Sequence, residues 1–460
     1  MNHLTDTIIA PATPQGQSAI AIVRLSGKDA IAITEKIFKG KKLSEVDSHT
    51  IHYGWIVDGE KEIDEVMVSV FRAPKTFTTE DSTEISCHGS PQIVQAILSL
   101  AISIGARSAD PGEFTLRAFL NGRIDLSQAE AVSDLIHATS SKSSEIALNQ
   151  LRGKVSSTLK QLRQELIDFA ALIELELDFS EEDVEFANRS RLKNLIHKII
   201  KVIVPLLDSF RWGNSIKQGI PVAIIGPPNA GKSTLLNTIL NEEKALVSDV
   251  AGTTRDFIED TIILDGISFR FIDTAGIRET SDALESQGIE RSIQKLREAE
   301  IVLYLSDVHR AVSDTIADFN KLNLSSTQSG FILLNKADTI STDDAENKVR
   351  EVIRLSGQKP FLITAKVMSS VQQIFTQLND YIKTSNQSEG TIINNSRHFE
   401  ALQNTKLSLQ RVLSGMDANV SSDLLTIDIR EALYYLGTIT GQVTTEDLLE
   451  SIFSKFCIGK

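Results

Sequence analysis

The chain has 460 residues, enough for about three domains of ~150 residues each. Hydrophobic residues make up 41% and charged residues 23%, an ordinary globular balance. The net charge of -14 disfavours tight, unaided nucleic-acid binding, because neutralising phosphates needs a basic surface. It still allows a local basic patch, or a basic partner that holds an RNA.

The two cysteines and the apolar runs exclude further classes of protein. Cys87 and Cys457 are too few for a disulfide framework and lack zinc-type spacing. The apolar runs are too short to cross a bilayer, and the N-terminus lacks the layout of a signal peptide. We therefore expect a cytoplasmic protein without a membrane partner.

Residues 1–118 have a mixed α/β pattern. Short β-branched runs predict strands at 18–25 and 65–71, and residues 91–104 predict a helix. From 119 to 216 the pattern is helical, with an apolar stripe typical of the core of a helix bundle. The stripe consists of Leu159, Leu162, Leu166, Phe169, Ile173 and Leu177.

Residues 217–383 alternate strands and helices. Buried parallel strands are expected at 220–225, 301–305, 331–334 and 361–363, as in a doubly wound, mostly parallel sheet. A polar linker is expected at 384–390. The rest, to residue 460, is helical, with a second apolar stripe at Leu425, Ile429, Leu433 and Leu436. We expect residues 119–216 and 384–460 to form one discontinuous helical domain into which the 217–383 domain is inserted.

The segment from Gly226 to Ser233 reads Gly-Pro-Pro-Asn-Ala-Gly-Lys-Ser, between a predicted strand and a predicted helix. This is the context of a phosphate-binding loop, in which backbone N–H groups and the helix N-terminus hold the phosphates. Lys232 would contact the β- and γ-phosphates, and the Ser233 hydroxyl would bind Mg²⁺. The Asn229 amide could help bind a monovalent cation where other enzymes place an arginine, or it could be only a turn residue.

Three more motifs follow in the order of a GTPase. The sequence Asn335-Lys-Ala-Asp338 predicts a carboxylate that accepts from the guanine N–H groups, and Thr364-Ala365 would support the base. The sequence Asp273-Thr-Ala-Gly276 would reach Mg²⁺ through water and the γ-phosphate through an N–H group. Thr254, after Gly252-Thr253, is the candidate switch ligand of Mg²⁺. Together these motifs predict a P-loop GTPase domain.

The residue after Gly276 departs from Ras-type enzymes. It is Ile277, which cannot orient a water as glutamine does there. Glu279, Asp282 and Glu285 follow as acidic candidates. From the residues alone, none of the three is preferred.

The terminus Phe456-Cys-Ile-Gly-Lys460 and the block Pro111–Glu130 resemble the bacterial MnmE (TrmE) family of tRNA modification GTPases. The opening segments at 6–14 and 22–27 also resemble this family. Thr79-Glu-Asp-Ser differs from the family's Thr-Gly-Glu-Asp, so we expect a slightly different loop. The resemblance extends over the whole chain.

The resemblance implies an N-terminal α/β domain that binds folate and dimerises the protein. Family members act with the flavoprotein MnmG in a heterotetramer or larger complex. They add an aminomethyl or carboxymethylaminomethyl group to C5 of the wobble uridine (position 34) of certain tRNAs. The one-carbon unit comes from a 5-formyl- or methylene-tetrahydrofolate derivative, and K⁺ promotes GTP hydrolysis.

The resemblance also implies residue roles. The K⁺ ligands would be Asn229, Ser248, Val250 and Thr253, and Glu285 would orient the water. The folate ligands would be Arg24, Glu84, Arg123 and Lys460. Cys457 is either a thiol near the reactive carbon of the folate or a half-buried residue that seats the tail. The full GTP-binding set would be Asn229, Ala230, Gly231, Lys232, Ser233, Thr234, Ser248, Asp249, Val250, Ala251, Gly252, Thr253, Thr254, Asp273, Thr274, Ala275, Gly276, Asn335, Lys336, Asp338, Thr364 and Ala365.

The rival interpretation is a switch GTPase of the ribosome-assembly type. Such proteins usually carry a basic RNA-binding appendage. The acidic chain has no Gly-x-x-Gly loop with basic flanks after the GTPase segment. Dependence of hydrolysis on K⁺ over Na⁺ would distinguish the two interpretations.

Overall fold

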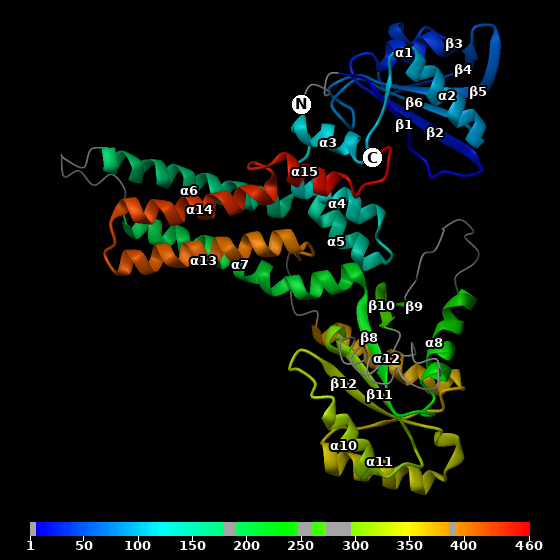
Figure 1. Cartoon of the computed structure of the whole chain (residues 1–460), viewed down its shortest axis with the longest axis vertical. Coiled ribbons are helices and arrows are strands. Elements are labelled where there is room, and N and C mark those ends of the chain that lie inside the picture. Colours follow the sequence, from blue (N-terminus) through cyan, green and yellow to red (C-terminus); the bar gives the residue numbers. More distant parts are fainter. Residues whose placement is uncertain (1–5, 179–188, 247–259, 273–295, 386–391) are drawn as a thin grey trace, which may run out of the picture. The chain divides into compact units, whose positions relative to one another are not determined.

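The computed structural model describes residues 6–178, 189–246, 260–272, 296–385 and 392–460 (Figure 1). The chain divides into two compact units. The first contains residues 1–136, 148–196 and 404–460, and the second contains residues 137–147 and 197–403. Each unit is built around its own sheet.

Seven strands form the sheet of the first unit, in the order β3-β4-β5-β6-β2-β1-β7. Neighbouring strands are antiparallel, except that β1 and β7 are parallel. The strands are β1 (Ile8–Pro11), β2 (Ser18–Ser26), β3 (Phe38–Gly40), β4 (Thr50–Asp58), β5 (Lys61–Phe71), β6 (Ser82–Gly89) and β7 (Arg107–Ser108). The helices beside them are α1 (Ala30–Ile37), η1 (Leu43–Glu45) and α2 (Pro91–Ser103).

One face of this sheet is covered and the other is open. Along strand β5, side chains alternate between the covered and the open face. Val66, Val68 and Val70 are buried in a core that includes residues of α1 and α2. Met67, which points the other way, is 45% exposed. The open face is therefore available for contacts with other molecules.

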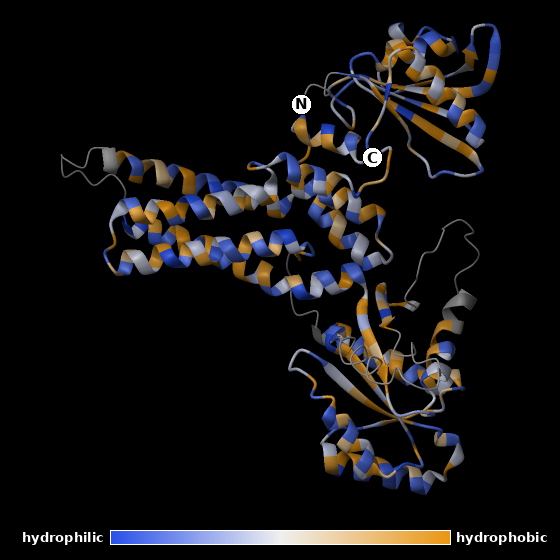
Figure 2. Cartoon of the chain, in the orientation of Figure 1, coloured by the Kyte–Doolittle hydropathy of each residue, from blue (hydrophilic) through white to orange (hydrophobic). Residues whose placement is uncertain are grey.

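The helical part of the first unit is centred on the pair α6 (Lys154–Asp178) and α14 (Ser422–Thr440), which pack against each other. The predicted stripe of α6 is buried from Leu159 to Ile173, and Leu425, Ile429 and Leu436 of α14 are buried as well. Hydrophobic and hydrophilic residues alternate along these helices, as Figure 2 shows. The other helices of this unit are α3 (Glu113–Leu120), α4 (Leu126–Ile136) and α15 (Glu446–Phe453). Three more helices have residues in both units: α5 (Ser141–Leu151), α7 (Arg189–Gln218) and α13 (Ser396–Asp417).

The sheet of the second unit has the order β13-β12-β11-β8-β10-β9. All its neighbouring strands are parallel except β9 and β10. The strands are β8 (Ile220–Ile225), β9 (Asp260–Leu264), β10 (Ile267–Ile272), β11 (Ile301–Asp307), β12 (Ser329–Asn335) and β13 (Phe361–Leu362). The helices around it are α8 (Lys232–Leu246), α10 (Val312–Lys321), η3 (Ala337–Thr339), α11 (Thr342–Ser356) and α12 (Met368–Ser385).

Helices cover both faces of this second sheet. Leu235 of α8 and Ile374 of α12 lie in one core cluster with strand residues, whereas Ile316 of α10 and Val352 of α11 lie in another. The doubly wound α/β architecture predicted from the sequence is confirmed, and so are its strands. The α12 helix continues to Ser385, two residues into the expected linker, and 386–391 lie outside the described residues. The four predicted domain ranges stay a prediction.

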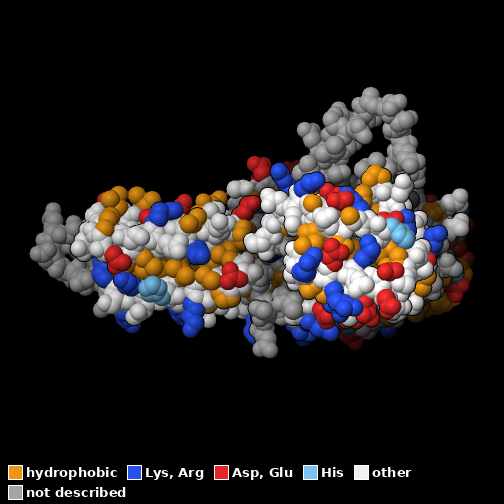
Figure 3. Space-filling view, turned by 90° about the horizontal axis from the view of Figure 1, so that it is seen from below, with side chains coloured by type: hydrophobic (Ala, Val, Ile, Leu, Met, Phe, Trp, Pro, Cys, Tyr) orange, Lys and Arg blue, Asp and Glu red, His pale blue; other side chains and the backbone are white. Residues whose placement is uncertain are grey.

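The face drawn in Figure 3 mixes Lys and Arg with Asp and Glu, so it presents no continuous basic surface in the part of the chain that is described. None of the helices among the described residues is long and apolar enough to span a membrane.

Candidate functional site

The phosphate-binding loop lies between β8 and α8, at the carboxyl edge of the second sheet. Its glycines are required by close packing, because a Cβ at Gly226 would collide with the Leu305 carbonyl and one at Gly231 with the Asn335 amide. Asn229 has a φ of 60°. The loop therefore has the tight shape in which backbone N–H groups can surround phosphates.

Lys232 is hydrogen-bonded to the backbone of its own loop. Its Nζ donates to the carbonyl oxygens of Gly226 at 2.8 Å and of Pro227 at 2.9 Å. Burial lowers the pKa of the Lys232 ammonium. Bound phosphates would supply the negative charge that the two neutral carbonyls lack. Ser233 is exposed at the first turn of α8, where a hydroxyl can reach a cation.

The buried side chain of Asn335 connects the phosphate loop to the base loop. Its Nδ2 donates to the Ala230 carbonyl at 2.7 Å, and its Oδ1 accepts from the Ala365 N–H at 2.9 Å. The Thr364 hydroxyl donates to Asp338 Oδ1 at 3.2 Å. Five of the predicted residues thus lie together, although they come from three separate segments.

Two neighbours of this loop were missed by the sequence analysis. The Ser370 hydroxyl accepts from the Thr364 N–H at 2.8 Å, and Asp307 pairs with Lys336 at 2.6 Å. The position of Asp307 at the end of a parallel strand beside β12 was the available signal, because such strand ends line the ligand edge of an open sheet. For Ser370 the sequence offers no such signal.

The switch segments lie outside the described residues. This applies to Ser248, Asp249, Val250, Ala251, Gly252, Thr253, Thr254, Asp273, Thr274, Ala275, Gly276, Ile277, Glu279, Asp282 and Glu285. Of the predicted cation ligands, only Asn229 and Ser233 are described. No cluster of three His, Cys, Asp or Glu side chains able to hold a metal occurs among the described residues.

A second group of predicted residues lies on the open face of the first sheet. Arg24 of β2 and Glu84 of β6 are register partners, and the Arg24 guanidinium donates to Glu84 Oε1 at 2.8 Å. Phe77 lies next to two cations, with its ring centre 5.9 Å from the Arg24 Cζ and 5.0 Å from the Arg123 Cζ. The ring therefore links Arg123 to the Arg24–Glu84 pair.

The C-terminal tail completes this group. Arg24 Nη1 donates to the Gly459 carbonyl at 3.4 Å, which places the neighbouring Lys460 beside the pair. Gly459 is buried with a φ of 94°, and a Cβ there would collide with the Pro11 carbonyl. Phe456 is buried as well, so these two residues anchor the tail. The Cys457 side chain is exposed, not half-buried.

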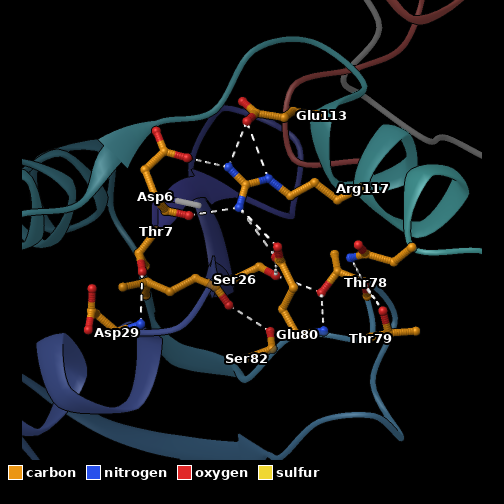
Figure 4. A network of polar contacts seen from close by, with 12 residues as sticks. Asp6, Thr7, Ser26, Asp29, Thr78, Thr79, Glu80, Ser82, Glu113 and Arg117 are labelled. Carbon is orange, nitrogen blue, oxygen red and sulfur yellow. Dashed lines mark hydrogen bonds and ion pairs between the residues drawn. The ribbon is translucent and has the colours of Figure 1, made fainter. Parts of the chain in front are cut away.

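An ion network in the same unit is centred on Arg117, as Figure 4 shows. The Arg117 side chain is 1% exposed and pairs with Asp6 at 2.6 Å, Glu113 at 2.9 Å and Glu80 at 3.2 Å. Burial opposes its charge, but Glu113, Glu80 and Asp6 outweigh burial and raise the pKa of Arg117. The network fixes Glu80, three residues after Phe77, and thus holds the loop that carries the ring.

The motifs and this fold define a P-loop GTPase. Comparison with known proteins then identifies the family. The family model of the MnmE helical domain matches residues 126–457, and that of the GTP-binding protein TrmE N-terminus matches residues 7–123.

Full-length relatives agree with these matches. The tRNA modification GTPase MnmE of Christiangramia forsetii is 49% identical and covers 99% of this chain and 100% of its own. That of Cytophaga hutchinsonii is 50% identical, over 100% of this chain and 98% of its own. The chain therefore belongs to the MnmE family, and GTP hydrolysis is its enzymatic activity.

Among solved structures, Aquifex aeolicus Era bound to GDP.AlF4- is 23% identical, with a TM-score of 0.29 over 41% of this chain and 66% of that chain. At this TM-score the likeness adds nothing to the assignment.

Proposed function

We propose that this GTPase acts with the flavoprotein MnmG to add an aminomethyl or carboxymethylaminomethyl group to C5 of the wobble uridine of certain tRNAs. The names of its full-length relatives support tRNA modification as the overall task. The observation that carries the folate part is the arrangement of Arg24, Glu84, Arg123 and the C-terminal tail around Phe77.

The chemistry of these side chains fits a reduced folate, which has a flat pterin with N–H donors and a tail of carboxylates. Glu84 can accept from pterin N–H groups, while Arg123 is exposed and Lys460 is half-exposed, so both can meet carboxylates. Phe77 offers an apolar ring beside them. The folate would supply the one-carbon unit, and these residues would bind and orient it. Cys457, exposed next to them, is the candidate thiol near the reacting carbon.

In the second unit, Mg²⁺ would be held by Ser233 and Thr254, and K⁺ by Asn229 with Ser248, Val250 and Thr253. These are oxygen donors, which both cations prefer. Asn229 is exposed in a left-handed turn, where its amide oxygen could meet a cation. K⁺ beside the phosphates would stabilise the charge that develops there, and Glu285 would orient the attacking water.

We expect the protein to act as a homodimer through the open face of the first sheet. The exposed apolar side chains on this face are Ile20, Ile51, Tyr53 and Met67. The register places Ile51, Ser69, Glu84 and Arg24 in one row across β4, β5, β6 and β2. An apolar patch of this kind next to a ligand site suits a second copy of the chain.

Direct binding of 5-formyltetrahydrofolate tests the folate site without any enzymatic readout. Calorimetric titration should show binding to the wild type and at least tenfold weaker binding to Arg24→Met, which loses a cation that pairs with Glu84. Lys39→Met removes the cation of an exposed pair with Glu62 elsewhere in the same sheet and should bind as the wild type does. Equal affinity of all three proteins would contradict the site.

A further inference from the structure

The turn that follows β11 is bound to the base-recognition loop at three points. The Val308 N–H donates to the Asn335 carbonyl at 2.9 Å. Lys336 Nζ donates to Asp307 Oδ2 at 2.6 Å. His309 Nε2 and the Thr339 hydroxyl are 2.7 Å apart. These contacts join the end of β11 to both ends of the segment that carries the base-reading residues.

The Asp307 carboxylate uses both of its oxygens in this turn. While Oδ2 accepts from Lys336, Oδ1 accepts from the His309 N–H at 2.9 Å. Burial opposes the charge of Asp307, but Lys336 and the His309 N–H outweigh burial and lower its pKa. The carboxylate is therefore both charged and fixed in direction at neutral pH.

Lys336 is held at its backbone and at its side-chain tip. Its backbone is left-handed, with a φ of 65°, and its carbonyl accepts from the Thr339 hydroxyl at 2.6 Å. Its ammonium is held by Asp307. A free lysine side chain would lose much of its rotamer freedom on being ordered by a ligand. Because the ion pair already restricts the side chain, less of that cost remains when a base arrives.

We propose that Asp307 is a positioning residue for nucleotide binding, which acts by holding Lys336 between Asn335 and Asp338 at the base site. This inference rests on the proposed guanine-reading role of Asn335 and Asp338. Asp307 acts on the base loop through Lys336, and the guanine base is common to GTP and GDP. Its effect should therefore be the same for GTP and for GDP.

A double-mutant cycle tests this coupling with the full-length chain and fluorescent GDP and GTP analogues. Asp307→Asn keeps an acceptor for the His309 N–H and removes the charge that holds Lys336. This variant should bind both nucleotides about tenfold more weakly than the wild type. The double variant Asp307→Asn, Lys336→Met should bind nucleotide no more weakly than Lys336→Met alone, because Asp307 acts through Lys336.

Asp318→Asn is the matched control. Asp318 pairs with Arg310 at 2.6 Å, and its side chain is 31% exposed, against 27% for Asp307. Its loss should leave nucleotide affinity unchanged. Thermal unfolding of each variant checks that the fold persists.

Two outcomes would overturn the inference: unchanged affinity in Asp307→Asn, or additive effects in the double variant. Asp338→Asn separates these outcomes from failure of the base site itself. If Asp338→Asn also leaves guanine nucleotide affinity unchanged, the proposed base site is wrong. If it weakens that affinity while Asp307→Asn does not, only the role of Asp307 is wrong.

Discussion

Thr79 has a left-handed backbone, with a φ of 63°, in the loop that carries Phe77. A β-branched residue rarely adopts this conformation, which glycine adopts freely. The chain reads Thr78-Thr79-Glu80-Asp81 in this loop. The loop is kept in place because Glu80 is bound by Arg117 and Ser26, the latter at 2.7 Å.

Replacing Thr79 by glycine should stabilise the protein. The left-handed conformation costs a β-branched residue roughly 1–2 kcal/mol, and the extra freedom of glycine in the unfolded chain costs about 0.5–1 kcal/mol. Thr79→Gly should therefore raise the free energy of unfolding by about 0.5 kcal/mol in urea denaturation. Thr158→Gly, in the exposed interior of α6, should lower it by a few tenths. A loss of stability in Thr79→Gly would show that the Thr79 hydroxyl contributes more than the strain costs.

Residues whose role depends on close sequence neighbours could be predicted. Residues whose role depends on partners far away in the sequence could not. The phosphate loop and Asn335–Asp338 are recognisable because their spacing along the chain carries the chemistry. Arg117 gives no such signal, because its partners Asp6 and Glu80 are far away in sequence and meet it only after folding. A buried arginine with three carboxylates can be found only from the structure.

Among the elements, the first and last residues of the strands and helices agree closely with the hydrophobic pattern of the sequence. The predicted strand at 220–225 is β8 (Ile220–Ile225), and the predicted helix at 91–104 is α2 (Pro91–Ser103). The open face of the first sheet was not predicted. An antiparallel sheet with one face on the core alternates with a period of two residues whether its second face meets water or another molecule, so the pattern along β5 does not say what meets Met67.

A charge on this open face should separate the two copies of the proposed homodimer. Met67 is the register partner of Tyr53 and of Ser86, in the middle of the face. Met67→Glu would place a carboxylate against the apolar surface of the second copy, where desolvation opposes it. Light scattering should show a dimer for the wild type and a monomer, or at least tenfold weaker association, for Met67→Glu. Leu355→Glu, an exposed leucine of α11 in the second unit, should remain dimeric. A dimeric Met67→Glu protein would place the contact elsewhere.

For the whole molecule, two candidate sites lie in two compact units. The first unit brings Arg24, Glu84, Arg123 and the C-terminal tail together, and the second holds the phosphate and base loops. Residues from both ends of the chain form the first site, since Arg24 contacts Gly459 across 435 positions. Only the family resemblance indicated this meeting, because no local pattern links the two ends.

Reconstituted tRNA modification tests the central claim most directly. The chain is combined with MnmG, a wobble-uridine tRNA, GTP, K⁺ and the folate, and the nucleosides are analysed by mass spectrometry. We predict a C5-substituted wobble uridine with the wild type, and its loss with Arg24→Met while GTP hydrolysis continues. An unmodified uridine with the wild type, or equal modification by Arg24→Met, would contradict the account.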